Sequence, residues 1–191
     1  MSRRFRRYQP IGLWVLIGLN VLMFVATTGD PDLVYSLGLQ PDSFSDRPWT
    51  IVTSMFVHKG LWHILANMLT LYFFGKYLTL LVGEERLLAV YFLGGLIGNA
   101  LYLLLADPLH TGIGASGAVF AVGGALAVIR PKARVLVFPI PYPVPLWGAV
   151  VGGCFIISLF PNVAWQAHLG GLLLGLCAGY YFKRRIGWFW R

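Results

Sequence analysis

Ser116 and His168 are the two residues of this sequence with the clearest potential for chemistry. Ser116 lies in the motif GASG (114–117) and His168 in AHLGG (167–171), and each motif stands at the start of an apolar segment. Polar and ionisable side chains are costly in lipid, so their presence there usually serves a function. A serine hydroxyl next to an imidazole can act as a nucleophile with its general base. We therefore predict a serine hydrolase that works inside a lipid bilayer.

The elements that must hold these residues are membrane-spanning helices. The 191 residues are 58% hydrophobic and 12% charged, whereas a soluble domain carries about 25% charged residues. Repeated apolar runs of roughly 20 residues predict an all-α, polytopic membrane bundle that forms one domain, 1–191. Its six expected spans are about 10–28, 61–82, 86–106, 115–130, 135–158 and 166–183. Four prolines between residues 139 and 145 predict an irregular first half for the fifth span.

The distribution of positive charge predicts the orientation of this bundle. With six spans, thirteen of the fifteen Lys and Arg residues fall on the side of the two termini, which the positive-inside rule assigns to the cytoplasm. The net charge of +8 is then explained by loops that face anionic lipid headgroups, and no nucleic-acid partner is expected. No good cleavage motif follows the run 10–28, so we interpret this run as a retained helix and not as a signal peptide.

The two candidate residues are predicted to lie at the same depth. Ser116 stands 14 residues before Arg130, and His168 stands 15 residues before Lys183. At about 1.5 Å per residue, both lie roughly 21–23 Å above the inner boundary. This leaves them about 10 Å below the outer surface of a hydrocarbon core of roughly 30 Å.

Small residues around both positions predict close packing of the two helices. Gly171 and Gly175 follow His168 by three and seven residues and share its helix face. Gly114 and other small residues surround the serine, and such residues let membrane helices approach closely. Taken alone, Ser116 could bond back to its own helix, and His168 could be a satisfied interior histidine. The shared depth and the small-residue stripe favour a Ser–His pair instead.

His63 and Asn67 form a second polar pair, on the span 61–82. Their spacing of four residues places them on one helix face. Two fixed donors at this depth would suit an oxyanion hole. The same spacing is equally typical of a polar clamp between helices, so both interpretations stay open.

The acidic residues exclude several other mechanisms. An intramembrane aspartyl protease needs two Asp within the bundle, a zinc peptidase needs a motif such as HExxH, and a triad needs an acid at the depth of the histidine. All the acids fall in loops or at span ends: Asp30, Asp32, Asp42, Asp46, Glu84, Glu85 and Asp107. The HExxH motif is absent as well, so a Ser–His dyad remains, with Phe120, four residues after Ser116, as a candidate to pack against the His168 ring.

The motifs resemble those of the rhomboid family of intramembrane serine proteases. The resemblance covers residues 47 to 180 and rests on GASG (114–117), HILAN (63–67) and AHLGGLLLG (167–175). It implies Ser116 as nucleophile, His168 as its base, and oxyanion stabilisation by His63, Asn67 and the backbone amide at Ala115. It also implies cleavage of single-span membrane proteins near the outer face through an acyl-enzyme, with no metal or cofactor. Two departures are that Thr50 follows Trp49 where many members have Arg, and that Thr79 stands where many have Glu.

Two other functions compete with this one. The first is a catalytically silent rhomboid-like module that binds membrane proteins, although such relatives usually lack the serine or the histidine. The second is a small channel, which would need polar residues continuing toward the inner side, where 121–129 and 172–182 are nearly all apolar. The short chain without a targeting segment favours a prokaryotic plasma membrane.

Overall fold

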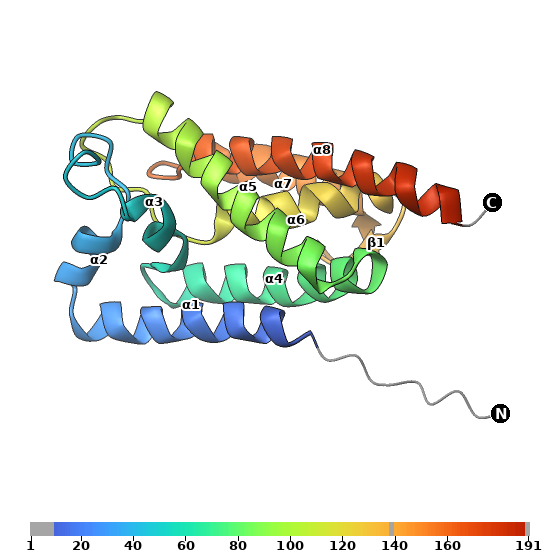
Figure 1. Cartoon of the computed structure of the whole chain (residues 1–191), viewed down its shortest axis with the longest axis horizontal. Helices are drawn as coiled ribbons and strands as arrows, with labels where there is room; N and C mark the ends of the chain where they lie inside the picture. Colours follow the sequence, from blue (N-terminus) through green and yellow to red (C-terminus); the bar gives the residue numbers. More distant parts are fainter. Residues whose placement is uncertain (1–9, 138–139, 190–191) are drawn as a thin grey trace.

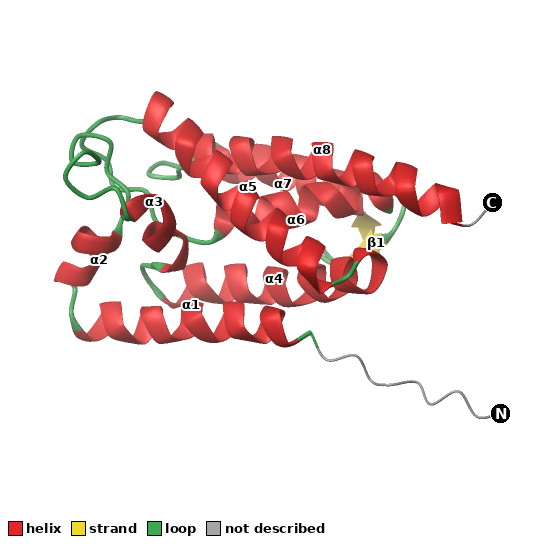
Figure 2. Ribbon diagram, in the orientation of Figure 1, coloured by secondary structure: helices red, strands yellow, loops and turns green. Residues whose placement is uncertain are grey.

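The computed structural model of the chain describes residues 10–137 and 140–189, most of them helical (Figures 1 and 2). In chain order the helices are α1 (Ile11–Gly29), α2 (Asp32–Leu37), α3 (Thr50–Thr53), the 3-10 turn η1 (Ser54–Phe56), α4 (Leu61–Val82), α5 (Glu84–Leu105), α6 (Ser116–Ile129), α7 (Leu146–Ser158) and α8 (Trp165–Phe189). Two short antiparallel strands, β1 (Arg134–Val135) and β2 (Val144–Pro145), precede α7.

The six predicted ranges each overlap one of the longer helices, and the fifth range has the irregular first half that its prolines predict. The range 135–158 is helical only from Leu146, because β1, β2 and the segment between them occupy its first part. Prolines lack the amide donor that a helix requires, which explains why the helix starts only after Pro145. The sixth helix, in contrast, runs past the predicted end at 183 to Phe189.

The bundle has the length and the apolar exterior of a membrane protein. Helices α1, α4 and α5 are long and apolar enough to cross a bilayer, and α6 and α7 are apolar but shorter. Large apolar side chains such as Trp14, Leu22, Phe73, Leu104 and Phe155 are exposed on the outside of these helices. An apolar exterior of this extent is typical of contact with lipid.

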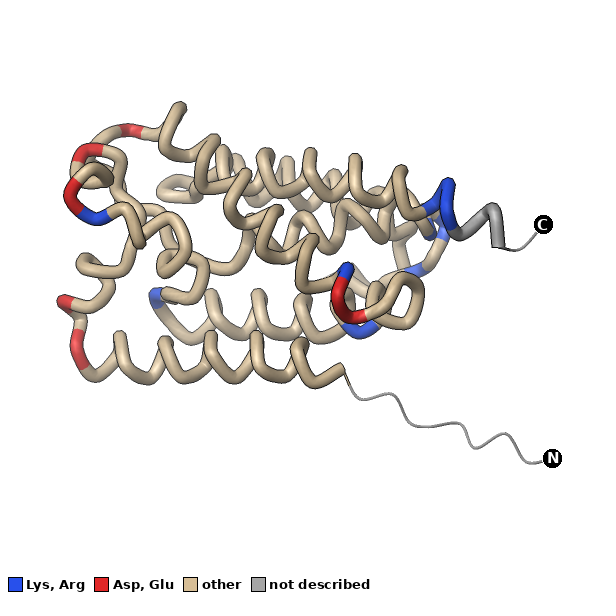
Figure 3. Tube along the Cα trace, in the orientation of Figure 1, with Lys and Arg blue, Asp and Glu red and all other residues tan. Residues whose placement is uncertain are grey.

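Charged residues separate toward the two ends of the bundle. Figure 3 shows most Lys and Arg at the end where α8 finishes, and most Asp and Glu at the opposite end, near α2. The exception at the basic end is the pair Glu84 and Glu85 in the first turn of α5. The Glu84 carboxylate accepts a hydrogen bond from the Gly12 amide, and this places a negative charge at the positive end of the α1 dipole.

Helix α6 forms the centre of the bundle and meets α8 through backbone atoms. A Cβ atom on Gly171 would lie 1.9 Å from the Gly117 carbonyl oxygen, and one on Gly175 would lie 2.1 Å from that of Ala121. One turn further, a Cβ on Gly179 would lie 2.5 Å from the Ala125 carbonyl oxygen. No side chain fits at these positions, so the glycine stripe of α8 is what allows the contact.

Candidate active site

Ser116 occupies the first position of α6, two residues after Gly114, whose backbone conformation favours glycine. Gly114 has φ +115, a region that residues with a side chain rarely adopt. A Cβ on Gly114 would also lie 2.7 Å from His63 Nε2. Gly114 therefore turns the chain into α6 and leaves room for the His63 ring beside the serine.

The structure brings Ser116 and His168 into direct contact. Ser116 Oγ lies 2.8 Å from His168 Nε2, within the range of a strong O–H···N hydrogen bond. His168 is almost fully buried, with only 4% of the residue exposed. Gly117 follows Ser116 directly and Gly171 lies three residues after His168, so the close backbone contact of the two glycines brings α6 and α8 together next to this bond.

The other nitrogen of the His168 ring, Nδ1, has no acidic partner among the described residues. Nδ1 is buried and has no hydrogen-bond partner among the described residues. The ring instead packs against Phe120, with centroids 4.8 Å apart and planes inclined by 48°. The contact with Phe120 expected from the sequence is thus present. The described residues also contain no cluster of His, Cys, Asp or Glu that could hold a metal ion.

His63 lies beside the segment that leads into the serine, and Asn67 follows it one turn later on α4. Asn67 is buried and its Nδ2 donates to the His63 carbonyl oxygen at 2.9 Å. This bond stays within α4 and so is not a clamp to another helix. The Nε2 atom of His63 lies beside Gly114, two residues before the serine.

Sequence reasoning gave no role to His58, which is a buried neighbour of the serine segment. His58 Nε2 accepts a hydrogen bond from the Ala115 amide at 3.3 Å, and His58 Nδ1 lies 3.3 Å from the Phe56 carbonyl oxygen. Its ring meets that of His63 edge-on, with centroids 4.9 Å apart. Burial, with a smaller contribution from His63, lowers the pKa of His58 to about 4. A neutral ring that donates through Nδ1 fits both bonds.

The bond to His58 has a consequence for the predicted oxyanion donors. The Ala115 amide, which the family resemblance suggests for this role, is directed to His58 Nε2 in this structure. The first turn of a helix leaves further backbone amides without partners in the helix. At the start of α6 these belong to Ser116 and the residues that follow it.

The two departures from the family pattern have different surroundings. Thr50 is buried and its hydroxyl donates to the Arg47 carbonyl oxygen at 2.6 Å. Arg47 itself donates to the Tyr35 carbonyl oxygen at 2.6 Å and lies 4.5 Å from the centre of the Tyr35 ring. Arg47, which precedes Trp49, thus holds together the loop between α1 and α4, where many family members have an arginine after the tryptophan. The Thr79 hydroxyl is buried without a hydrogen-bond partner among the described residues.

Comparison with known proteins points to a single family. Residues 45–185 match the family model of the Rhomboid domain. The chain is 32% identical over 200 residues to "Rhomboid protein 1, mitochondrial" of Saccharomyces cerevisiae, covering 95% of this chain and 56% of that protein. It is 35% identical over 159 residues to "RHOMBOID-like protein 12, mitochondrial" of Arabidopsis thaliana, covering 72% and 47%. It is also 28% identical over 137 residues to "Presenilin-associated rhomboid-like protein, mitochondrial" of Pongo abelii, covering 66% and 36%.

These relatives correct one expectation and establish one. The expected prokaryotic plasma membrane is contradicted, because the two relatives at 32% and 35% identity described above are mitochondrial proteins of eukaryotes. The chain spans about half the length of the first two relatives. The Rhomboid domain nevertheless covers most of the chain, and one relative is more than 30% identical over nearly all of it. The chain belongs to the rhomboid family.

Proposed function

We propose that this protein is an intramembrane serine endopeptidase that cleaves single-span membrane proteins through a Ser116–His168 dyad. The observation that carries the proposal is the 2.8 Å separation of Ser116 Oγ and His168 Nε2, between two helices that touch through their backbones. The proposed topology has six spans with both termini in the cytoplasm and the dyad toward the outer face. The charge separation along the bundle supports this orientation.

The reaction follows from the placement of the two side chains. His168 Nε2 takes the Ser116 hydroxyl proton while Oγ attacks the carbonyl carbon of the scissile peptide bond. The resulting imidazolium gives this proton to the leaving amine as the C–N bond breaks. Water then attacks the acyl-enzyme, with His168 as base again, and releases Ser116 and the new carboxyl terminus.

Oxyanion stabilisation is proposed for donors on the serine side. His63 Nε2 beside Gly114 and the amide of Asn67 lie on α4, one turn apart. The amides in the first turn of α6 add donors at the positive end of the helix dipole. The Asn67 amide would exchange its bond to the His63 carbonyl for one to the oxyanion. The Ala115 amide would contribute only after leaving His58.

Reconstitution in liposomes with a single-span substrate tests the proposal. The wild-type protein should cleave the substrate, and Ser116→Ala and His168→Ala should not. Ser36→Ala is a matched control, because Ser36 is an exposed serine whose hydroxyl only bonds back to the Asp32 carbonyl oxygen in α2. A fluorophosphonate should label the wild-type protein and Ser36→Ala but spare Ser116→Ala. Cleavage that persists in Ser116→Ala would exclude the dyad. Substrate binding without any cleavage or labelling would favour the silent binding module.

A further inference from the structure

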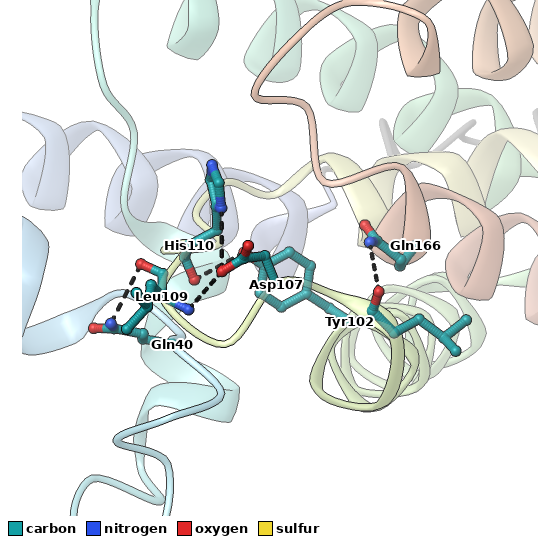
Figure 4. Close-up of polar contacts among 7 residues, drawn as sticks. Gln40, Tyr102, Asp107, Leu109, His110 and Gln166 are labelled. Carbon is teal, nitrogen blue, oxygen red and sulfur yellow. Dashed lines mark hydrogen bonds and ion pairs between the residues drawn. The ribbon is translucent and has the colours of Figure 1, made fainter.

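We infer that the C-terminal end of α5, residues 98–105, sets the distance between Ser116 and His168, with Tyr102 and Gln166 as positioning residues. This inference rests on the proposed dyad and concerns how the fold holds it. Neither residue contacts the dyad by a hydrogen bond. Tyr102 ties the serine side of the dyad to this short stretch of α5, and Gln166 ties the histidine side to it (Figure 4).

Tyr102 holds the segment that leads into the serine. Its hydroxyl donates to the His110 carbonyl oxygen at 3.1 Å, and only 4% of the residue is exposed. Its ring lies over Gly112, where a Cβ would come within 2.8 Å of it. Leu39 fixes Gly112 from the other side through two backbone hydrogen bonds of 2.9 and 2.7 Å. Only three residues separate this clamped glycine from Ser116.

Gln166 holds the helix that carries the histidine. Its Nε2 donates to the Leu105 carbonyl oxygen at 3.2 Å, at the end of α5. The carbonyl oxygen of the next residue, Ala167, lies close to Gly98, where a Cβ would be only 2.5 Å from this oxygen. His168 follows directly, so the first turn of α8 is fixed to α5 at two neighbouring points.

The missing third residue makes this anchoring important. In a triad, a hydrogen bond to Nδ1 orients the imidazole. His168 Nδ1 has no such partner in the described part of the chain. The Nε2 position therefore depends on the Phe120 contact and on where the α8 backbone begins. The contact with Phe120 orients the ring, whereas Gln166 fixes the backbone from which the ring projects.

The two anchors lie on one face of one helix. Tyr102 and Leu105 are three residues apart, so they are neighbours on the surface of α5. If this end of α5 shifts, the serine segment and the histidine helix shift together and their separation is kept. Loss of one anchor releases one side alone, which changes the separation. A shift of about 1 Å in a reacting group is enough to slow a reaction by up to a hundredfold.

Two variants remove the anchoring hydrogen bonds without removing bulk. Tyr102→Phe deletes the hydroxyl and keeps the ring over Gly112, and Gln166→Met keeps the length of the side chain but has no donor. Gln40→Met is the matched control. Gln40 is buried to a similar degree and donates its Nε2 to the Leu109 carbonyl oxygen at 3.3 Å. This hydrogen bond joins the loop between α5 and α6 to the segment after α2, and no residue of α5 takes part in it.

The measurements are the rate constant of fluorophosphonate labelling, kcat and KM for a single-span substrate, and the thermal midpoint. All are taken on the full chain well below the midpoint and normalised to folded protein. We expect Tyr102→Phe and Gln166→Met each to lower the labelling rate and kcat at least fivefold, with KM within twofold of the wild-type value. Gln40→Met should keep the wild-type kcat and labelling rate.

Three results would overturn the inference. They are wild-type labelling rates in both anchor variants, a rate deficit that disappears after normalisation to folded protein, and an equal loss of rate in Gln40→Met. Failure of the proposed function would give a different result from failure of this inference. In that case the wild-type protein itself would not be labelled, or would be labelled no faster than Ser116→Ala.

Discussion

His168 contacts Ser116 through Nε2 at 2.8 Å and presents its Nδ1 to a site without a hydrogen-bond partner among the described residues. The ring is held by the face of Phe120 at 4.8 Å. The proposed dyad would therefore depend on packing and backbone position, where a triad would use an acid. Four predictions test this arrangement and its surroundings.

Phe120→Ala should lower kcat by about tenfold, equivalent to roughly 1.4 kcal/mol of barrier. Loss of the ring lets the imidazole rotate away from the Ser116 hydroxyl. Phe120→Tyr keeps the aromatic contact and should keep most of the activity. Cleavage kinetics in proteoliposomes measure the effect. An unchanged rate in Phe120→Ala would show that the aromatic contact does not orient the histidine.

Asn67→Ala should lower kcat by about a hundredfold if its amide serves the oxyanion, since removal of one such donor costs 10²–10³ in other serine hydrolases. Thr70→Ala is the control on the same helix, because the Thr70 hydroxyl bonds only to the Ala66 carbonyl oxygen of its own helix. Comparison of kcat and KM for the two variants separates a transition-state effect from weaker substrate binding. Equal kcat values in both variants would count against this role for Asn67.

Acidification should destabilise the protein through His58. The pKa of His58 is about 4 in the folded protein, whereas the ordinary histidine value, expected for the unfolded chain, is 6.5. The unfolded chain therefore binds the proton more readily. The stability that His58 contributes is fully present above pH 6.5 and is lost as the pH falls toward 4, by roughly 3 kcal/mol.

Thermal midpoints at a series of pH values measure the effect of His58. The decline between pH 6.5 and 4 should be steeper in the wild-type protein than in His58→Gln, whose amide can still accept from Ala115 but does not titrate. Parallel curves for the two proteins would assign the pH dependence to other groups.

Gly171→Ala should prevent α6 and α8 from packing. The new methyl group would lie 1.9 Å from the Gly117 carbonyl oxygen, and overpacking of this kind costs about 1–3 kcal/mol or more. Gly152→Ala is a matched change in α7, where a Cβ would meet nothing within 4 Å. This second variant should be neutral or more stable, because alanine is the better helix former by about 1 kcal/mol. Equal thermal midpoints would contradict the close backbone contact.

The sequence was most informative about regular helices and the residues that share a depth within them. Equal spacing from the charged ends placed Ser116 level with His168, and a glycine repeat indicated the face on which their helices meet. The roles of His58, Tyr102 and Gln166 were not predictable in this way. Each bonds to a backbone atom at the end of a helix or in an irregular segment, and His58 is 57 residues from its partner Ala115. No periodic pattern marks such a contact. The fifth range shows what single residue types can add, because its four prolines predicted the irregular first half that precedes α7.

The contact between α6 and α8 also bears on the entropy of the site. Side chains lose rotamer freedom when they are buried between helices, at up to about 2 kcal/mol for the longest of them. Gly171, Gly175 and Gly179 meet carbonyl groups directly and have no rotamers to lose. Helices α6 and α8, which carry Ser116 and His168, therefore come together with little cost in side-chain entropy. The contact itself joins rigid peptide units, so it cannot relax through a change of rotamer.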